Sequence, residues 1–329
     1  MRIVVVGGAG FVGSAVSRKL VQDQGASVLV LDALTASASL ASLAPIASSP
    51  RCAFRKADIR EPGRVAALLQ AFAPDAVIHT AAAAPGPASS TGDADFAGSW
   101  RLMEAVRSYW ANLPDPRRDA FRFVGVSCTD HTLGHATASP RAACDDVLMS
   151  WHKAYGLPSV LVRAPQAFGP CQFPSAFVPE SLIAGLEGEA VARPAGGVRN
   201  WVHVEDLASA LIASAEAGTP GTIYAAAGND RATPAEVAAC IGRLVGRYAA
   251  IPAAAGRTRD EAPPATASEE AHPGLDTSRL KQDTGWRPVM TLEGGLSATI
   301  RWYMANEGWW RPLLHAGAQD DHYGVLRIA

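Results

Sequence analysis

Several kinds of segment are missing from this sequence. It has no apolar run approaching the ~18 residues that a membrane-spanning helix needs. Its 29 Lys and Arg are balanced by 31 Asp and Glu, so no basic excess favours nucleic acid. A glycine-rich segment begins at Gly7 and leaves no space for a signal peptide. We therefore expect a cytoplasmic protein with neither a membrane nor a nucleic acid as partner.

Cysteine is also scarce. The five cysteines are Cys52, Cys128, Cys144, Cys171 and Cys240, and no two have the spacing of metal ligands. An odd number of scattered cysteines favours reduced thiols over a disulfide framework. We expect no metal site, and we find no internal repeat.

The chain opens on an apolar strand and a glycine-rich turn. Met1–Val6 is rich in β-branched residues, which predicts a buried parallel strand. Gly7, Gly10 and Gly13 follow, and a helix is predicted over Phe11–Gln24. In this pattern the first glycine permits a tight turn, the second lets a pyrophosphate approach the backbone, and the third lets the helix pack on the sheet.

The next strand completes a dinucleotide-binding pattern. Ser27–Leu31 is a second apolar run, and it ends at Asp32. A carboxylate there can accept hydrogen bonds from both ribose hydroxyls and repels a 2′-phosphate, so NAD is favoured over NADP. Phe11 and Val12 lie at the helix N-terminus, whose free N–H groups favour the phosphates.

Strands and helices continue to alternate over the next hundred residues. Strands are predicted at Cys52–Lys56, Asp75–His79, Phe121–Ser127 and Ser159–Arg163, with helices at Glu61–Phe72, Ser99–Trp110 and Ala142–Tyr155. This alternation predicts an α/β fold with a Rossmann-type, doubly wound parallel sheet.

Residues at the predicted strand ends are candidates for cofactor contacts, because ligands of such sheets lie at the carboxyl ends of the strands. Asp58 and Ile59 follow the third strand, where Asp58 can bind an adenine amino group. Asp58 can equally cap the helix Glu61–Phe72, and both roles can hold together. Ala81 follows the fourth strand, where a small residue lets the backbone run beside the cofactor.

The second half has looser patterns. Helices are predicted at Pro179–Leu186, Thr233–Val245, Leu275–Thr284 and Leu292–Glu307. A strand beginning at Arg199 leads into a helix capped near Glu205, and Gly308–Ala329 shows little periodicity.

Several motifs together resemble the extended short-chain dehydrogenase/reductases, and the dTDP-glucose 4,6-dehydratases among them. They are the glycine motif at 7–13, Ala57-Asp58-Ile59, His79-Thr80-Ala81-Ala82, Phe168-Gly169-Pro170, and Trp201 with Val204-Glu205-Asp206. The resemblance implies a Rossmann domain over 1–165 that binds NAD. It implies a smaller C-terminal substrate lobe over 166–329, interleaved with the first domain. It also implies a small-molecule substrate such as a nucleotide sugar, and a homodimer formed by helices Ser99–Trp110 and Ala142–Tyr155. The contacts expected in that homodimer are the apolar residues Leu102, Met103, Val106, Val147 and Leu148.

The chain departs from this family where the hydroxyl of the sugar is oxidised. The family uses a Tyr-x-x-x-Lys pair, and no tyrosine here is followed by lysine at the fourth position. Counting back from Tyr155 puts Thr137 in place of the tyrosine and Arg141 in place of the lysine. Thr137 cannot act as a base near neutral pH, whereas Arg141 keeps the charge that holds the nicotinamide ribose.

The acid/base segment after the fifth strand is altered as well. Thr129, Asp130 and His131 resemble the family's Thr-Asp-Glu, with histidine in place of the glutamate and Cys128 inserted. In that position Asp130 is a candidate general acid and His131 a candidate base. The alternative is a surface loop with a solvated histidine.

Two residues remain as candidate substrate ligands. Gln166 lies where the family has a Ser-Asn-Asn run, and Arg199 can pair with a diphosphate. Alternatively, Arg199 forms a structural ion pair with Glu205 or Asp206. We interpret His203 as structural.

Three functions fit the sequence. The first is a divergent enzyme that performs non-redox acid/base chemistry, namely elimination, epimerisation or cyclisation, on a nucleotide sugar or a secondary metabolite. The second is an inactive cofactor-binding homologue that partners an active paralogue. The third is a redox dTDP-sugar 4,6-dehydratase with a substituted base.

Overall fold

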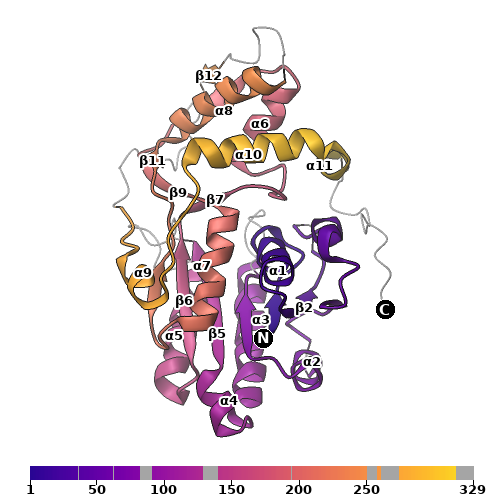
Figure 1. Cartoon of the computed structure of the whole chain (residues 1–329), viewed down its shortest axis with the longest axis vertical. Helices are drawn as coiled ribbons and strands as arrows, with labels where there is room; N and C mark the ends of the chain where they lie inside the picture. The colour runs from indigo at the N-terminus through magenta and orange to yellow at the C-terminus, as the bar shows by residue number, and fades with distance from the viewer. Residues whose placement is uncertain are drawn as a thin grey trace.

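The computed structural model describes residues 1–35, 37–61, 63–81, 91–128, 140–193, 195–249, 258–260 and 274–315. Figure 1 shows a sheet flanked by helices, with a second group of elements above one end of its strands. No helix in these ranges is long and apolar enough to cross a lipid bilayer.

A seven-stranded sheet in the order β10-β6-β5-β4-β1-β2-β3 forms the centre of the molecule. Its strands are β1 (Arg2–Val6), β2 (Ser27–Asp32), β3 (Cys52–Lys56), β4 (Ala76–His79), β5 (Arg122–Cys128), β6 (Ser159–Ala164) and β10 (Ile223–Ala225). Every neighbouring pair is parallel. The prediction of a parallel Rossmann-type sheet is confirmed, with one edge strand supplied by the second half of the chain.

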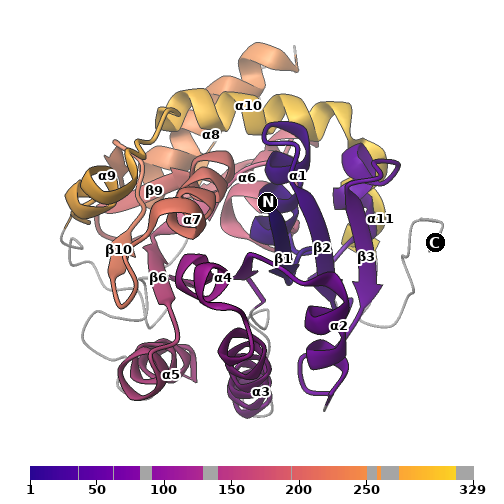
Figure 2. The ribbon, with the colours of Figure 1, turned by 60° about the horizontal axis from the view of Figure 1, so that its bottom comes forward.

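Helices cover both faces of the sheet, as Figure 2 shows. One face holds α1 (Phe11–Gln22), the 3₁₀ helix η1 (Leu40–Ile46), α7 (Val204–Ala217) and α9 (Ser278–Thr284); the other holds α2 (Arg64–Phe72), α3 (Thr91–Ala111) and α5 (Pro140–Tyr155), with α4 (Asp115–Ala120) before β5. Alternate residues of β1 enter opposite cores: Ile3 and Val5 face α1 and α7, and Val4 and Val6 face α3. Covering both faces explains why the strands read as continuous apolar runs.

A smaller lobe lies above the carboxyl ends of the strands (Figure 1). It comprises β7 (Gln166–Phe168), β8 (Val191–Arg193), β9 (Arg199–His203), β11 (Arg231–Ala232), β12 (Thr258–Asp260), α6 (Phe177–Leu186), α8 (Pro234–Tyr248), α10 (Leu292–Ala305) and α11 (Glu307–His315). A third apolar cluster, containing Leu182, Ile241 and Trp310, forms its core. The chain enters the lobe after β6, returns to the large sheet through α7 and β10, and leaves it again.

Several predicted boundaries are wrong in the first half. Helix α2 begins at Arg64 rather than Glu61, because Gly63 has a left-handed φ of +76° at its N-cap. Helix α3 begins at Thr91 rather than Ser99, through residues of low helix propensity. Helix α5 begins at Pro140, since proline is tolerated in a first helical turn.

Boundaries also differ in the second half. Helix α7 begins at Val204 with His203 as its N-cap, so the cap lies before Glu205. Helix α9 begins at Ser278, three residues later than predicted. The segment after Glu307 contains α11, which sequence periodicity missed; its Trp309 and Trp310 pack against aromatic side chains of α10.

Candidate functional site

The turn between β1 and α1 fits closely against the end of β4. Gly7 has a φ of +78°, and a Cβ built there would lie 2.5 Å from the backbone nitrogen of Ala81. A Cβ at Gly13 would lie 2.2 Å from the carbonyl oxygen of Gly7 and 2.7 Å from Cα of Gly8. Both positions therefore exclude any side chain, as the sequence pattern requires.

The N-terminus of α1 lacks a side-chain cap. Gly10 is the N-cap residue, and among the described residues no side-chain hydrogen bond caps the first turn. A Cβ at Gly10 would have its nearest neighbour at 3.2 Å, so the protein's own packing is less restrictive there. Phe11 and Val12 open the helix and are half-buried. This terminus can bind an anion through its backbone N–H groups and the helix dipole.

Asp32 joins the end of β2 to this turn. One carboxylate oxygen accepts a hydrogen bond from the backbone N–H of Ala9 at 2.9 Å, and the other accepts from Leu34 at 2.8 Å. Burial raises the pKa of Asp32, and the two backbone donors oppose that rise. The carboxylate is only 7% exposed and lies beside the glycine turn, where a ribose would follow the pyrophosphate.

Asp58 and Ile59 lie next to α2 and α3 without capping α2. Asp58 accepts hydrogen bonds from the backbone N–H and the guanidinium of Arg60, and that side-chain contact holds its pKa below the usual range. The proposed N-cap role is wrong, because α2 begins six residues later. Ile59 packs against α3 at Gly98, where a built Cβ would lie 2.9 Å from its Cδ1.

The predicted acid/base residues Thr129, Asp130 and His131 lie outside the described residues, as does Thr137. Arg141 lies in the first turn of α5, and its side chain is also outside the described part.

Sequence reasoning missed two polar pairs that flank this region, one buried and one half-buried. Ser127, near the end of β5, donates a hydrogen bond to the carboxylate of Asp145 in α5 at 2.5 Å. His79, at the end of β4, is 3.2 Å from the hydroxyl of Ser99 in α3. His79, Ser99 and Asp145 line one small cavity between the sheet and these two helices. Both strand ends are therefore fixed to helices just before the candidate site segments.

Gln166 and Arg199 lie on paired strands of the smaller lobe. Gln166 in β7 is the register partner of Trp201 in β9, two residues after Arg199. Nε of Arg199 is buried and has no hydrogen-bond partner within the described residues. The alternative interpretation, an ion pair of Arg199 with Glu205 or Asp206, is wrong. Glu205 pairs with Arg18 instead, and Asp206 accepts hydrogen bonds from the backbone N–H groups of residues 289 and 290.

His203 joins β9 to α7. Its Nδ1 accepts a hydrogen bond from the backbone N–H of Glu205 at 3.3 Å, and its ring packs edge-on against Phe168. Burial lowers its pKa from 6.5 to about 4, so the ring is neutral at pH 7. Its Nε2 is buried and without a partner among the described residues.

Comparison with known proteins shows one consistent likeness. Residues 3–227 match the model of the NAD dependent epimerase/dehydratase family. The dTDP-glucose 4,6-dehydratase of Neisseria meningitidis serogroup B is 31% identical, covering 98% of this chain and 99% of that protein.

Solved structures agree with this likeness. The dTDP-glucose 4,6-dehydratase of Streptomyces venezuelae with NAD and TYD bound has a TM-score of 0.82 and 28% identity, covering 95% of this chain and 100% of that one. The dTDP-glucose 4,6-dehydratase of Bacillus anthracis in complex with NAD has a TM-score of 0.81 and 26% identity, covering 95% of this chain and 99% of that one.

Proposed function

Because the chain belongs to the NAD-dependent epimerase/dehydratase family, we propose that it is an NAD-binding enzyme acting on a nucleotide sugar by proton transfer. The observation that carries this proposal is the position of two groups of N–H donors. The α1 terminus, which has no side-chain cap among the described residues, lies in the large domain. The buried Nε of Arg199, which has no partner in the same part of the chain, lies in the lobe above the strand ends. Both groups favour phosphates.

The residues present fit NAD. Gly7 and Gly13 let the turn pack closely against neighbouring backbone, and Gly10 lies at the α1 terminus where the pyrophosphate would approach. Asp32 lies where the adenosine ribose would follow. We assign Phe11, Val12, Asp58, Ile59 and Ala81 to the adenosine and pyrophosphate contacts, and Arg141 to the nicotinamide ribose. When bound, NAD supplies a hydride acceptor.

The lobe supplies the substrate contacts. An arginine with a buried, unpaired N–H gains a charge-assisted hydrogen bond when a diphosphate approaches. The amide of Gln166, on the neighbouring strand, can donate to and accept from sugar hydroxyls. These groups support a nucleotide-sugar substrate.

Proton transfer falls to the segment after β5. Asp130 is assigned as general acid and His131 as general base, with Thr129 orienting the substrate. Thr137 cannot remove a hydroxyl proton near pH 7, so elimination, epimerisation or cyclisation is favoured over hydroxyl oxidation. An inactive partner of an active paralogue is the contrasting function.

A redox dTDP-sugar 4,6-dehydratase with a substituted base is the second candidate. The observation that favours it is the similarity over nearly the full length to dTDP-glucose 4,6-dehydratases.

One experiment separates these functions. The NAD-loaded protein is incubated with dTDP-glucose and other nucleotide sugars while products and reduced-nicotinamide absorbance are followed. Substrate conversion without an absorbance transient, abolished in Asp130→Asn or His131→Asn, supports the proposal. A 4-keto-6-deoxy product formed at about one turnover per second, a typical enzyme rate, supports the redox alternative instead. Binding of NAD without any nucleotide sugar contradicts both and supports the inactive homologue.

We also propose a homodimer formed by α3 and α5, which lie side by side. The contacts expected from the sequence must be corrected: Leu102, Met103, Val106 and Leu148 are buried within the protomer against the sheet. The outer faces instead carry Trp100, 46% exposed, and Tyr155, 54% exposed. Each of these rings packs at 5.1 Å against Trp151, which is itself buried. Two exposed aromatic rings held in this way suit a protein–protein interface.

A further inference from the structure

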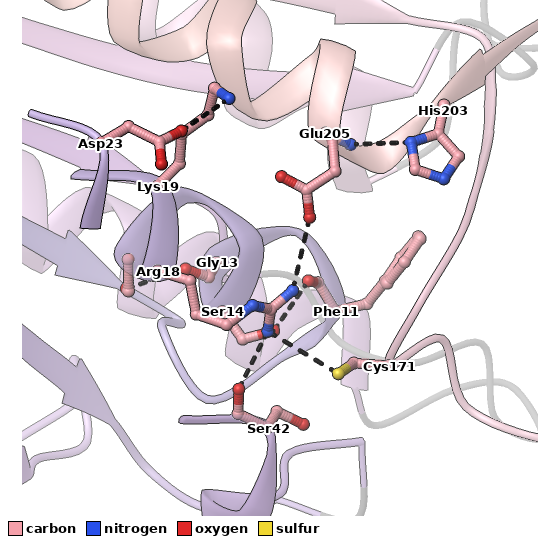
Figure 3. Close-up of polar contacts among 11 residues, drawn as sticks. Phe11, Gly13, Ser14, Arg18, Lys19, Asp23, Ser42, Cys171, His203 and Glu205 are labelled. Carbon is pink, nitrogen blue, oxygen red and sulfur yellow. Dashed lines mark hydrogen bonds and ion pairs between the residues drawn. The ribbon is translucent and has the colours of Figure 1, made fainter. Parts of the chain in front are cut away.

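The guanidinium of Arg18 lies at the junction between the large domain and the smaller lobe (Figure 3). Its Nη1 donates to Oγ of Ser14 at 3.1 Å, to the carbonyl oxygen of Ser42 at 2.9 Å and to Sγ of Cys171 at 3.6 Å. Its Nη2 is 3.6 Å from Oε1 of Glu205. The Arg18 side chain is only 12% exposed, so these contacts are largely shielded from water.

Two partners of Arg18, Cys171 and Glu205, lie near the two crossings, which are the segments where the chain passes between the large domain and the smaller lobe. Cys171 follows β7, the first strand after the chain leaves the large sheet. Glu205 is the second residue of α7, where the chain returns from β9 to that sheet. Arg18 itself belongs to α1, the helix whose N-terminus is assigned to the cofactor. One side chain therefore contacts both crossings from the cofactor helix.

The candidate substrate ligands are on the same two segments. Gln166 precedes Cys171 in the β7 segment, and Arg199 precedes Glu205 in the β9 segment. The two strands are hydrogen-bonded to each other, with Gln166 opposite Trp201. A shift at either crossing therefore moves both candidate ligands relative to α1.

We propose that Arg18 is a positioning residue that holds the smaller lobe, with Gln166 and Arg199, in its binding position over the cofactor helix. The inference rests on the proposed nucleotide-sugar function. Arginine suits this role because its planar fork presents five donors in fixed directions, whereas a lysine ammonium is a single point charge. The Glu205 carboxylate is 40% exposed, so the interior carbonyl and thiol contacts matter as much as the ion pair.

The geometry at Cys171 supports this role. Cys171 has a left-handed φ of +63°, which residues other than glycine rarely adopt. Burial raises the pKa of its thiol, so Arg18 contacts a neutral sulfur that is 5% exposed. The loop is thus held in an unusual conformation at the point where Arg18 reaches it.

The test compares Arg18→Met, Arg18→Lys and Glu205→Gln, each loaded with NAD. Lys19→Met is the matched control, because Lys19 is the next residue of α1 and pairs only with Asp23 at 3.0 Å among the described residues. Calorimetry measures the affinity for NAD and, in the loaded protein, for dTDP. We expect Arg18→Met to weaken dTDP binding about tenfold with less than a twofold change for NAD, and Arg18→Lys to fall between it and the unmodified protein.

Two outcomes would overturn the inference: unchanged dTDP affinity in Arg18→Met, or equal losses for NAD and dTDP, which would indicate a general structural role. If the unmodified protein binds NAD but no dTDP, the proposed nucleotide-sugar substrate is contradicted. The positioning role of Arg18 is then tested by amide hydrogen exchange. In that case Arg18→Met should speed exchange at least tenfold in 166–173 and 199–206 but not in 2–13. Uniform or unchanged exchange would contradict the positioning role.

Discussion

At the scale of single residues, buried polar side chains do two jobs at once. Asp32 closes the glycine turn through two backbone hydrogen bonds and also lies where a ribose would bind. His203 caps α7 through Nδ1 and keeps Nε2 buried without a partner in the described structure. Substitutions at either position therefore affect stability, and at Asp32 they also affect the proposed ribose contact, so the test variants must keep an acceptor in place.

For Asp32, the change is Asp32→Asn, which removes the charge and retains an acceptor for Ala9 or Leu34. The carboxylate would repel a 2′-phosphate, so we expect the preference of NAD over NADP to fall about tenfold, which corresponds to ~1.4 kcal/mol. Titration of both cofactors measures the ratio, and urea unfolding checks that the variant is folded. An unmodified protein that binds NADP as tightly as NAD would contradict the assignment of Asp32.

For His203, stability should depend on pH. Its pKa is 6.5 when unfolded and about 4 when folded, so between these values the unfolded chain binds more protons. The contribution of neutral His203 is complete above pH 6.5 and is lost as pH falls towards 4, by roughly 3 kcal/mol. The free energy of unfolding, measured with urea across this pH range, should depend more steeply on pH in the unmodified protein than in His203→Asn. The variant keeps a capping acceptor. Equal slopes would show that His203 is not the group responsible.

At the scale of elements, different glycines of the β1–α1 unit serve packing and the proposed cofactor binding. Gly13 is enclosed by backbone atoms of Gly7 and Gly8, whereas a Cβ at Gly10 would meet only the carbonyl oxygen of Gly7, at 3.2 Å, among the described residues. Helices α3 and α5 make a similar division: one face is part of the core, and the other carries exposed aromatic rings.

Gly13→Ala and Gly10→Ala form a matched pair of variants. Gly13→Ala should destabilise the protein by about 3 kcal/mol, because its Cβ would overlap backbone that cannot move independently. Gly10→Ala should change the free energy of unfolding by less than ~1 kcal/mol and still abolish measurable NAD binding, by obstructing the pyrophosphate. Denaturant unfolding and calorimetry measure the two effects. If Gly10→Ala retains its affinity for NAD, the assignment of the pyrophosphate to this turn is contradicted.

For the interface helices, Trp100→Glu should convert the proposed dimer to a monomer, since a charge would be buried in an aromatic contact. Sedimentation velocity at several concentrations provides the measurement. Val289→Glu is the control, because Val289 is 82% exposed and lies in the segment before α10. A concentration-independent monomer in the unmodified protein would contradict the dimer itself.

At the scale of the whole molecule, the proposed function divides the binding groups between the two parts. In that proposal the large domain contributes the glycine turn that binds the cofactor, and the smaller lobe contributes Gln166 and Arg199. The family's Tyr-x-x-x-Lys pair has no counterpart in the sequence.

We therefore expect slow turnover of dTDP-glucose to a 4-keto-6-deoxy sugar, below ~10⁻³ per second. Loss of a positioned base typically costs 10²–10⁴-fold, and losses in separate steps compound. Restoring the pair as Thr137→Tyr with Arg141→Lys should not rescue this reaction, because Pro140 lies between the two positions and opens α5, and a helix does not run unbroken through a proline. Product analysis over several hours tests both statements. Turnover near one per second would show that another residue serves as the base.

The sequence by itself determined the β1–α1–β2 unit, the alternating parallel sheet and the family. These features depend on local periodicity and on glycines whose role is set within about thirty residues of chain. The sequence also named Gln166 and Arg199 as candidate ligands, and these assignments stay predictions.

Only the tertiary structure decided which surfaces these elements present. Periodicity shows that a helix has an apolar face but not what covers it, so Leu102 and Met103 were assigned to an interface and lie in the core. Asp58 pairs with Arg60 instead of capping α2. Arg18 meets Cys171 across 153 positions of sequence. No local pattern encodes such a contact, because it exists only once the lobe has folded back onto the cofactor helix.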